Sequence, residues 1–180
     1  DIIAHMRHRV DEFSQKYHMN FSLVATPAEG LSGRFVKIDK EKYGIIEGVT
    51  DRDYYTNSFH IPVYYPISAF KKIQLEAPYH ALTNGGHISY VELDGDPTQN
   101  LDAFEKVVRY MKEQGIGYGS INHPVDRDTC PKCGRSEEEG PHFQRIRRIT
   151  GYLVGDMSKW NDGKTAEEHD RVKHKLEFED

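Results

Sequence analysis

The chain of 180 residues is 37% hydrophobic and 29% charged, with a net charge of −5 at pH 7, which is typical of one folded domain and not of a disordered chain. A mildly acidic chain lacks the concentrated basic surface that direct nucleic-acid binding requires, and no apolar run approaches the roughly 18 residues that span a bilayer, so we expect neither partner. Both cysteines belong to one CPKC motif, which is no secreted disulfide framework, and the cytoplasm is therefore the expected compartment.

Apolar residues recur at spacings of three and four over residues 1–18, which predicts a helix with one apolar face. This segment is charged from its start, so we do not expect a signal peptide. The chain lacks an initial methionine, and we expect it to be a piece of a longer protein. Residues 20–26 alternate and predict a strand, whereas PAEGLSGR over residues 27–34 predicts a loop because proline and glycine break regular structure.

Short strand-like pieces are predicted over residues 44–50 and 60–67, on either side of the polar stretch 51–58. The following segment, residues 77–86, is rich in turn residues and is expected to be irregular. It leads into a strand predicted over residues 87–95, where apolar and polar residues alternate.

A helix is predicted over residues 101–114, with Asn100 as its cap and Gly115 as its stop. Its predicted apolar face consists of Leu101, Phe104, Val107, Val108 and Met111. Residues 115–121 form the next predicted strand, and the order strand, helix, strand indicates a parallel crossover unit and hence an α/β fold. Residues 165–180 are predicted to be a solvated helix and tail. The histidines expected on polar surfaces include His5, His8, His18, His169 and His174.

Residues 147–155, RRITGYLVG, place Gly151 in the middle of a short apolar segment. Glycine in such a segment costs stability, and it usually marks a bulge, a positive φ angle or a close backbone approach. That local interpretation stands unless a larger pattern gives the glycine another role.

Such a pattern is present, because IRRITGYLV resembles the C-terminal signature of glycyl radical enzymes. The residues that fit it are Ile146, Arg148, Ile149, Gly151, Tyr152 and Val154, while Thr150 departs from the usual Cys, Ser or Ala. The motifs TPAEGLSGRF, YYTNSFHIPV, NGGHISYVEL, INHPVDRD, CPKCGR and DRVKH accompany it. Together they make the chain, from about residue 20 to residue 174, similar to the C-terminal portion of the anaerobic (class III) ribonucleoside-triphosphate reductases.

The resemblance implies that the chain is part of a ten-stranded α/β barrel of the glycyl radical enzyme type. Residues 1–120 would belong to the barrel, residues 121–144 would form a zinc-knuckle-like loop, and residues 145–180 would form the radical loop and a C-terminal helix or tail. Gly151 would store the radical, because a Cβ would crowd a planar Cα radical and hinder a partner sulfur. The family passes this radical to a barrel cysteine that is missing from this sequence, so the chain alone is expected to be inactive.

The resemblance also implies partners. These are a ribonucleoside triphosphate substrate, a radical S-adenosylmethionine activase with an iron–sulfur cluster, the N-terminal part of the same enzyme, and a second copy in a homodimer; ATP and dNTP effectors would bind outside this stretch. The predicted substrate-binding residues are Tyr55, Thr56, Asn57 and Ser58, whose donors could meet nucleotide phosphates. Local sequence alone favours an Asx or Ser/Thr turn there.

Cys130 and Cys133 form a CxxC pair, which suits tetrahedral zinc but supplies only two ligands. His123, His142 or an acidic residue could complete the site, or the site could be lost or reduced by a loop deletion. A redox-active pair is the alternative, although such a pair is typical of a helix start after a strand. Two other functions stay open as well: another glycyl radical enzyme of the pyruvate formate-lyase type, and a non-catalytic interaction module that carries a zinc ribbon.

Overall fold

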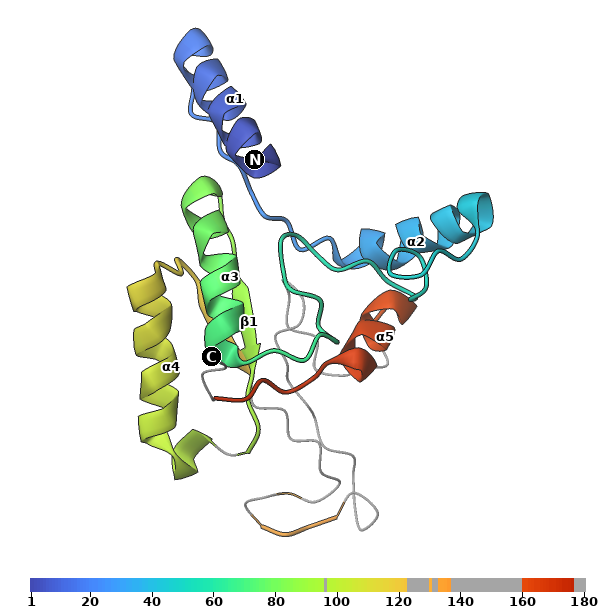
Figure 1. The fold of residues 1–180 in the computed structure, drawn as a ribbon, viewed down its shortest axis with the longest axis vertical. Coiled ribbons are helices and arrows are strands. Elements are labelled where there is room, and N and C mark those ends of the chain that lie inside the picture. Colours follow the sequence, from blue (N-terminus) through green and yellow to red (C-terminus); the bar gives the residue numbers. More distant parts are fainter. Residues whose placement is uncertain (96, 123–129, 131–132, 137–159, 177–180) are drawn as a thin grey trace.

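The computed structural model describes residues 1–95, 97–122, 130, 133–136 and 160–176, and Gly151, His123 and His142 lie outside the described residues. The described helices are α1 (Ile2–Tyr17), α2 (Glu29–Tyr43), α3 (Ala69–Leu82), α4 (Leu101–Gln114), α5 (Asp162–Asp170) and a short 3₁₀ turn, η1 (Pro97–Gln99); the strands are β1 (Ser89–Glu92) and β2 (Gly119–Asn122). Figure 1 shows α3 and α4 beside β1, while α2 and α5 lie together on the other side.

The unit β1–α4–β2 confirms the predicted crossover, since the two strands pair in parallel with Ser89 opposite Gly119 and Glu92 opposite Asn122. The ends of α4 follow local chemistry. The Asn100 side chain accepts a hydrogen bond from the backbone N–H of Ala103 at 3.0 Å, and the helix stops where the chain turns left-handed. Both signals are readable in the sequence, which is why the predicted and observed bounds agree.

The hydrophobic core lies where α3 and α4 pack against the two strands. Its buried members are Ala69, Ile73, Val91, Leu93, Val107 and Met111. Fully burying a side chain such as valine or leucine stabilises the fold by about 1.5–3 kcal/mol. Only two of the five residues predicted to share the apolar face of α4 reach this core, because Leu101 and Val108 remain 64% and 46% exposed.

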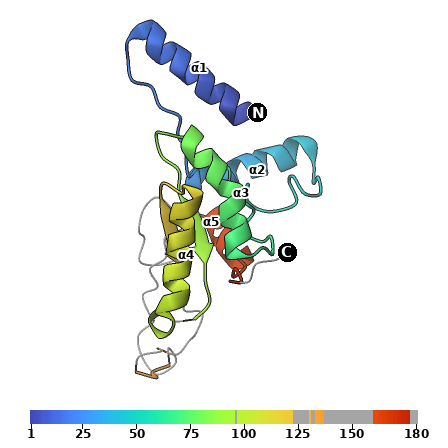
Figure 2. The same cartoon turned by 60° about the vertical axis from the view of Figure 1, so that its left-hand side comes forward.

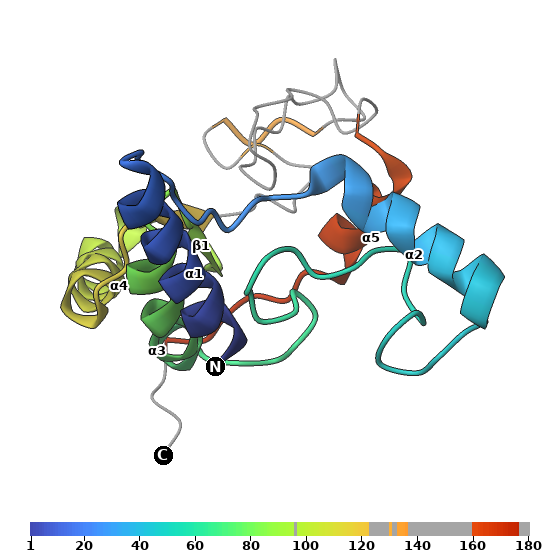
Figure 3. The same cartoon turned by 90° about the horizontal axis from the view of Figure 1, so that it is seen from above.

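The predicted loop at residues 27–34 is wrong, because α2 begins at Glu29 and runs through both of its glycines. Gly33 lies against Gly163 of α5, and a Cβ built on Gly163 would come within 2.8 Å of the Gly33 Cα. The two helices therefore touch backbone to backbone (Figure 3), and the glycine that resembled a helix breaker serves a close approach.

Several predicted strands are also absent from the described residues. Of residues 20–26, only Val24 makes a bridge, to Gly86, and residues 44–50 and 60–67 belong to no strand. In the last of these segments the backbone bonds elsewhere: the N–H of Ile61 donates to the Glu76 carboxylate, and the carbonyl of Val63 accepts from the N–H of Val172. The turn predicted over residues 77–86 is wrong in its first part, because α3 continues through Pro78 to Leu82.

The segment 171–176 returns across the end of β1 after α5. The His174 N–H donates to the Glu92 carbonyl at 2.7 Å, and the Ala69 N–H donates to the Lys175 carbonyl at 2.8 Å. The predicted helix is confirmed over residues 165–170, which belong to α5, but the expectation that the segment is solvated is wrong at Glu167, Glu168 and His174. Lys164 and Glu167 of α5 and His174 are all buried, because they form ion pairs and hydrogen bonds with the rest of the fold.

Helix α1 has the predicted bounds but buries none of its residues, and it projects from the remainder in Figure 2. Its exposed apolar side chains include Ile2, Met6, Phe13 and Tyr17, and those of α2 include Leu31, Phe35 and Ile38. In the part of the chain that is described, no helix combines the length and the apolar character needed to cross a bilayer.

Candidate functional site

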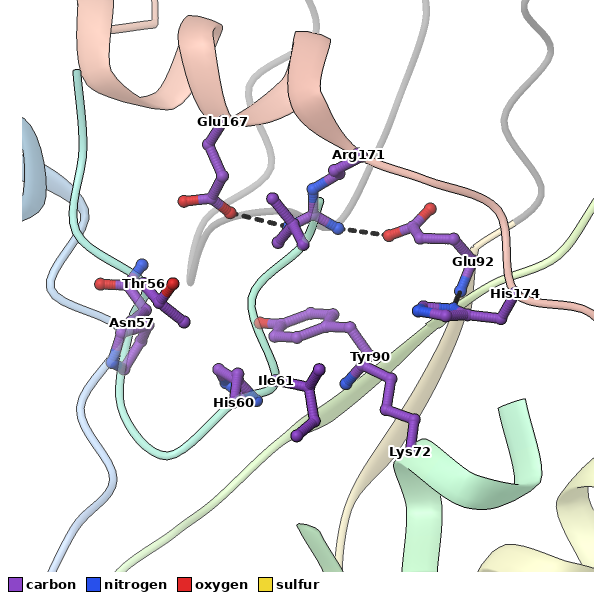
Figure 4. Close-up of a pocket in the computed structure, with 12 residues that line it drawn as sticks. Thr56, Asn57, His60, Ile61, Lys72, Tyr90, Glu92, Glu167, Arg171 and His174 are labelled. Carbon is purple, nitrogen blue, oxygen red and sulfur yellow. Dashed lines mark hydrogen bonds and ion pairs between the residues drawn. The ribbon is translucent and has the colours of Figure 1, made fainter. Parts of the chain in front are cut away.

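A pocket opens between the two groups of helices, and it is built from segments far apart in the sequence (Figure 4). The loop before α3 forms one wall, α3 and β1 form the floor, and α5 with the following segment forms the opposite wall. The lining residues are Pro27, Thr56, Asn57, His60, Ile61, Val63, Lys72, Tyr90, Glu92, Glu167, Arg171 and His174.

The structure brings only part of the predicted substrate-binding stretch to this pocket. Thr56 and Asn57 line it. The Tyr55 hydroxyl instead donates to Asp39 at 2.8 Å, and the Ser58 hydroxyl donates to the Thr26 carbonyl at 3.1 Å, with Ser58 at a positive φ of 52°. The role of all four residues in substrate binding stays a prediction, and the geometry places Thr56 and Asn57 where a ligand could reach them.

Arg171 is the centre of a buried ion-pair cluster on one wall. Its guanidinium donates to the carboxylate of Glu92 and, at 2.9 Å, to that of Glu167. Lys164 lies 2.5 Å from the second oxygen of Glu167, and the Asn122 amide donates to Glu92 at 2.8 Å. Burying charges is favourable only when they are paired and hydrogen-bonded in this way. The cluster thus fastens α5 to the ends of β1 and β2.

Lys72 and Glu76 form a second buried pair one helical turn apart on α3. The Lys72 ammonium lies 2.5 Å from Glu76, whose same oxygen accepts the backbone N–H of Ile61 at 2.9 Å. Burial lowers the pKa of Lys72 despite its partner. Burial alone would raise the pKa of Glu76, but the nearby His60 ring and Lys72 ammonium hold that pKa well below its ordinary range. Glu76 is therefore a fixed negative charge under the pocket.

Three histidine rings lie next to this pair. His80 and His87 stack with ring centroids 4.1 Å apart, and the His60 ring stands edge-on to both His87 and Tyr90 at 5.6 Å. Burial is the main cause that lowers the pKa of His80, and it lowers the pKa of His87 to about 4 with help from the charges of its two histidine neighbours. At neutral pH, His80 and His87 are therefore neutral rings.

His174 was expected on the surface, and the structure overturns that expectation. Its Nδ1 accepts the backbone N–H of Glu92 at 2.9 Å, and burial followed by the charge of Lys72 lowers its pKa to about 4. The sequence patterns did not single out His60, Lys72 or Arg171 as site residues either. The one available signal was a lysine and a glutamate spaced by four positions on the apolar side of a helix, as at Lys72 and Glu76.

The predicted metal ligands are described only in part. Cys130 and Cys133 lie in a tight turn, in which the Gly134 N–H donates to the Cys130 carbonyl at 2.8 Å and Gly134 has a φ of 73°. Such a turn can present two sulfurs to one point. Within the described ranges, no group of three or more His, Cys, Asp or Glu side chains could hold a metal ion. The other candidate ligands fall outside those ranges.

Comparison with known proteins relates the chain to one protein family. The sequence pattern of the family described as anaerobic ribonucleoside-triphosphate reductase matches residues 1–174. The chain is 40% identical over 191 residues to the anaerobic ribonucleoside-triphosphate reductase of Enterobacteria phage T4, and 37% identical over 190 residues to that of Escherichia coli strain K12. These alignments cover 97% and 96% of this chain but only 31% and 26% of the relatives, so the chain spans less than a third of their length.

Solved structures agree at the level of the fold. An anaerobic ribonucleotide reductase superposes with a TM-score of 0.75 over 97% of this chain and 28% of its own, at 20% sequence identity. The Thermotoga maritima anaerobic ribonucleotide reductase with dATP bound in its specificity site gives a TM-score of 0.63 over 85% of this chain and 25% of its own, at 18% identity. The arrangement of helices and strands is therefore one that these reductases contain.

Proposed function

The chain belongs to the anaerobic ribonucleoside-triphosphate reductase family, and from this we propose that it is the C-terminal, radical-storing portion of such an oxygen-sensitive enzyme. The match of the family pattern across residues 1–174 carries the proposal. It favours a reductase over the two alternatives, a pyruvate formate-lyase-like enzyme and a zinc-ribbon interaction module. The α/β portion described here would form part of a ten-stranded barrel with the remainder of the enzyme.

Gly151 is the proposed radical residue. The residues around it fit the glycyl radical signature, and only glycine leaves the Cα free of a side chain. An activase with an iron–sulfur cluster and S-adenosylmethionine would remove one hydrogen from this Cα. The stored radical would supply a thiyl radical on a cysteine of the remaining enzyme. The present chain would therefore store the radical, and the cysteine of the remaining enzyme would contact the substrate.

The pocket of Figure 4 is the proposed substrate site. Its two cationic side chains, Lys72 and Arg171, already pair with buried carboxylates. The sequence predicted that Thr56 and Asn57 meet nucleotide phosphates; we infer instead that these neutral donors and acceptors meet the hydroxyls of the ribose, because both cations of the pocket are already paired. The pocket would therefore hold the sugar of a ribonucleoside triphosphate and leave the phosphates toward solvent or toward the rest of the enzyme.

Zinc is proposed at Cys130 and Cys133, with His123, His142 or an acidic residue as the further ligands. The CxxC spacing is one that zinc sites use, and the turn in which the Gly134 N–H donates to the Cys130 carbonyl supports this assignment. The metal would be structural, and it would hold the loop that precedes the radical segment. A homodimer and a cytoplasmic location are likewise proposed from the family alone.

The exposed apolar sides of α1 and α2 support the view that other parts of the enzyme cover them. Side chains such as Phe13 and Phe35 remain 41% and 49% exposed. Apolar groups gathered on exposed helices usually mark an interface, and relatives of this chain are more than three times its length.

The deciding experiment is anaerobic activation of the full-length enzyme with its activase, S-adenosylmethionine and a reductant. Electron paramagnetic resonance should show a doublet, because one α-hydrogen remains on the radical glycine, and α-deuterated glycine should collapse the splitting. Oxygen should then cut the chain at Gly151 and release the C-terminal fragment that follows the cut.

Gly151→Ala should abolish both the doublet and the oxygen-dependent cleavage. Gly30→Ala is the matched control, because nothing lies within 4 Å of a Cβ added at that position, and it should retain both signals. A doublet that persists in Gly151→Ala would disprove the assignment of the radical.

A further inference from the structure

His60 is a titratable side chain that lines the pocket next to a buried carboxylate. It lies on the loop between Asn57 and Ile61, lines the pocket, and keeps 13% of its side chain exposed. In Figure 4 its ring lies beside Tyr90, across the pocket from Arg171. Behind the ring, Nδ1 is 3.6 Å from the Glu76 carboxylate. The ring thus has a fixed negative charge on one side and the pocket on the other.

We propose that His60 is a catalytic residue that moves a proton from the 3′-hydroxyl to the departing 2′-hydroxyl of the ribose. The inference rests on the proposed function, because it requires that the pocket hold the ribose of a nucleotide. It goes beyond that function by assigning the proton transfer to a residue of this chain.

The first support is that Glu76 is held in place. Its Oε1 accepts the Ile61 N–H at 2.9 Å and lies 2.5 Å from the Lys72 ammonium. Its Oε2 is buried and has no hydrogen-bond partner within the described residues, and the same is true of His60 Nδ1. A carboxylate behind an imidazole orients the ring and stabilises the imidazolium that forms when the ring takes a proton. At 3.6 Å the two groups are within ion-pair range but not hydrogen-bonded in this state, so the carboxylate acts on the ring through its charge.

The second support is that the other histidines are committed elsewhere. His80 Nδ1 accepts the Gly117 N–H at 3.1 Å, so its Nε2–H donates to the Ser89 hydroxyl at 2.9 Å. The Thr83 hydroxyl donates to the Tyr79 carbonyl at 2.7 Å and therefore accepts from His87 Nδ1 at 3.3 Å. Both rings are held neutral in one tautomer, and neither lines the pocket.

His174 does line the pocket, but its Nδ1 accepts the Glu92 N–H, which a protonated ring could not do. The remaining charged groups are already paired. The titratable and charged groups that surround His60 or line the same pocket are Lys72, Glu76, His80, His87, Tyr90, Glu92, Glu167, Arg171 and His174. Among these residues and His60, only His60 combines a pocket position with a carboxylate that would stabilise its protonated form.

The proposed step balances without any further reactant. Once the thiyl radical of the proposed function has taken the 3′ hydrogen atom and become a thiol, C3′ carries an unpaired electron and a hydroxyl. His60 takes the proton of this hydroxyl, the C2′–O bond breaks, and the departing oxygen takes a proton from His60 and leaves as water. The sugar is left with a ketone at C3′ and the unpaired electron at C2′, and His60 returns to its starting state.

The test uses the full-length activated enzyme with His60→Gln, and with His169→Gln as the control because His169 is an exposed histidine of α5 outside the pocket. His60→Gln should give the parent radical doublet and a KM near that of the parent. Its rate of deoxyribonucleotide formation should fall by about 10²- to 10⁴-fold, the usual contribution of a general acid–base group. His169→Gln should match the parent in all three measurements.

Two further readouts separate catalysis from structure. Substrate labelled with tritium at C3′ should still release label in His60→Gln, because hydrogen abstraction precedes the step assigned to His60. Added imidazole should restore part of the turnover of His60→Ala, which it would not do for a folding defect. Parent-like turnover in His60→Gln, loss of its doublet, or failure of imidazole to rescue His60→Ala would each overturn the proposal. Absence of a doublet in the parent would instead refute the proposed function.

Discussion

The contact between α2 and α5 offers a quantitative test of the fold. A Cβ on Gly163 would lie 2.8 Å from the Gly33 Cα and 3.1 Å from its N. Carbon atoms in contact normally stand about 3.5–4.0 Å apart, so Gly163→Ala creates an overlap of roughly 1 Å. The position of a Cβ is fixed by its own backbone and the atoms that it meets are backbone atoms, so no rotamer change can relieve the overlap. Helix α5 must therefore move away from α2.

Overpacking of this kind costs about 1–3 kcal/mol, and the higher helix propensity of alanine offsets up to about 1 kcal/mol of it. We expect a net loss of roughly 1–2 kcal/mol in the free energy of unfolding. The control is Gly30→Ala, since Gly30 is also the second residue of its helix but faces open space. It should be neutral or stabilising by up to about 1 kcal/mol.

Urea denaturation followed by tryptophan fluorescence measures this difference. The chain has a single tryptophan, Trp160, which immediately precedes the capping residue of α5 and should report the docking of that helix. With an m-value of about 2 kcal/mol per molar urea, the middle of the usual range, Gly163→Ala should unfold at roughly 0.5–1 M less urea than the parent. Equal midpoints for Gly163→Ala and Gly30→Ala would refute the backbone contact between the two helices.

Three further predictions concern charge, pH and metal. Arg171→Met leaves the buried Glu92 without its arginine partner and should lower the free energy of unfolding by about 3–5 kcal/mol, measured by urea or heat. The control Arg109→Met removes an exposed pair with Glu105 and should lower it by at most about 1 kcal/mol. Similar losses in the two variants would contradict the buried cluster. Because the pKa of His174 is lowered to about 4 from 6.5, the unfolded chain binds a proton that the folded chain excludes, so stability should fall by about 1.4 kcal/mol per unit as pH drops from about 6.5 to about 4. His174→Asn, which keeps an acceptor for the Glu92 N–H, should flatten this decline, and an unchanged pH profile would count against the buried neutral ring. Elemental analysis of protein purified without added metal should find zinc in the parent and less zinc in Cys133→Ser; a parent without metal would remove the zinc proposal.

Sequence predictions were accurate where the determining residues are neighbours in the chain, and they failed where the determining contact joins residues that are far apart. Helix α4 was predicted to its ends because Asn100 and Gly115 act within one helical turn. Helix α2 was missed because the meaning of Gly33 depends on Gly163, which lies far away in the chain. Helix α3 was missed in part because Pro78 resembles a breaker, although tertiary packing keeps the helix intact around it.

Residues of the candidate site were predicted from the sequence only where they belong to a recognisable motif. Thr56 and Asn57 belong to a recognisable stretch, and they line the pocket. The ion pair between Glu92 and Arg171 joins residues 79 positions apart, and no local pattern specifies it. Both residues lie next to turn-like or charged segments, whose composition is typical of exposed residues. Their burial follows from the return of the chain after α5, which only the folded structure reveals.

That return bears directly on the proposed radical chemistry. Asn122 ends β2, Arg171 follows α5, and both donate to the same oxygen of Glu92. The chain thus leaves the described sheet and comes back to it at one buried carboxylate, and Gly151 lies between these two points in the sequence. A buried ion pair is often no more stabilising than an apolar replacement, so stability alone is a weak reason for this one. A stronger reason is that this ion pair joins both flanks of the proposed radical segment to a wall of the proposed substrate pocket. Radical transfer requires the radical residue to keep a fixed position relative to the site that uses the radical.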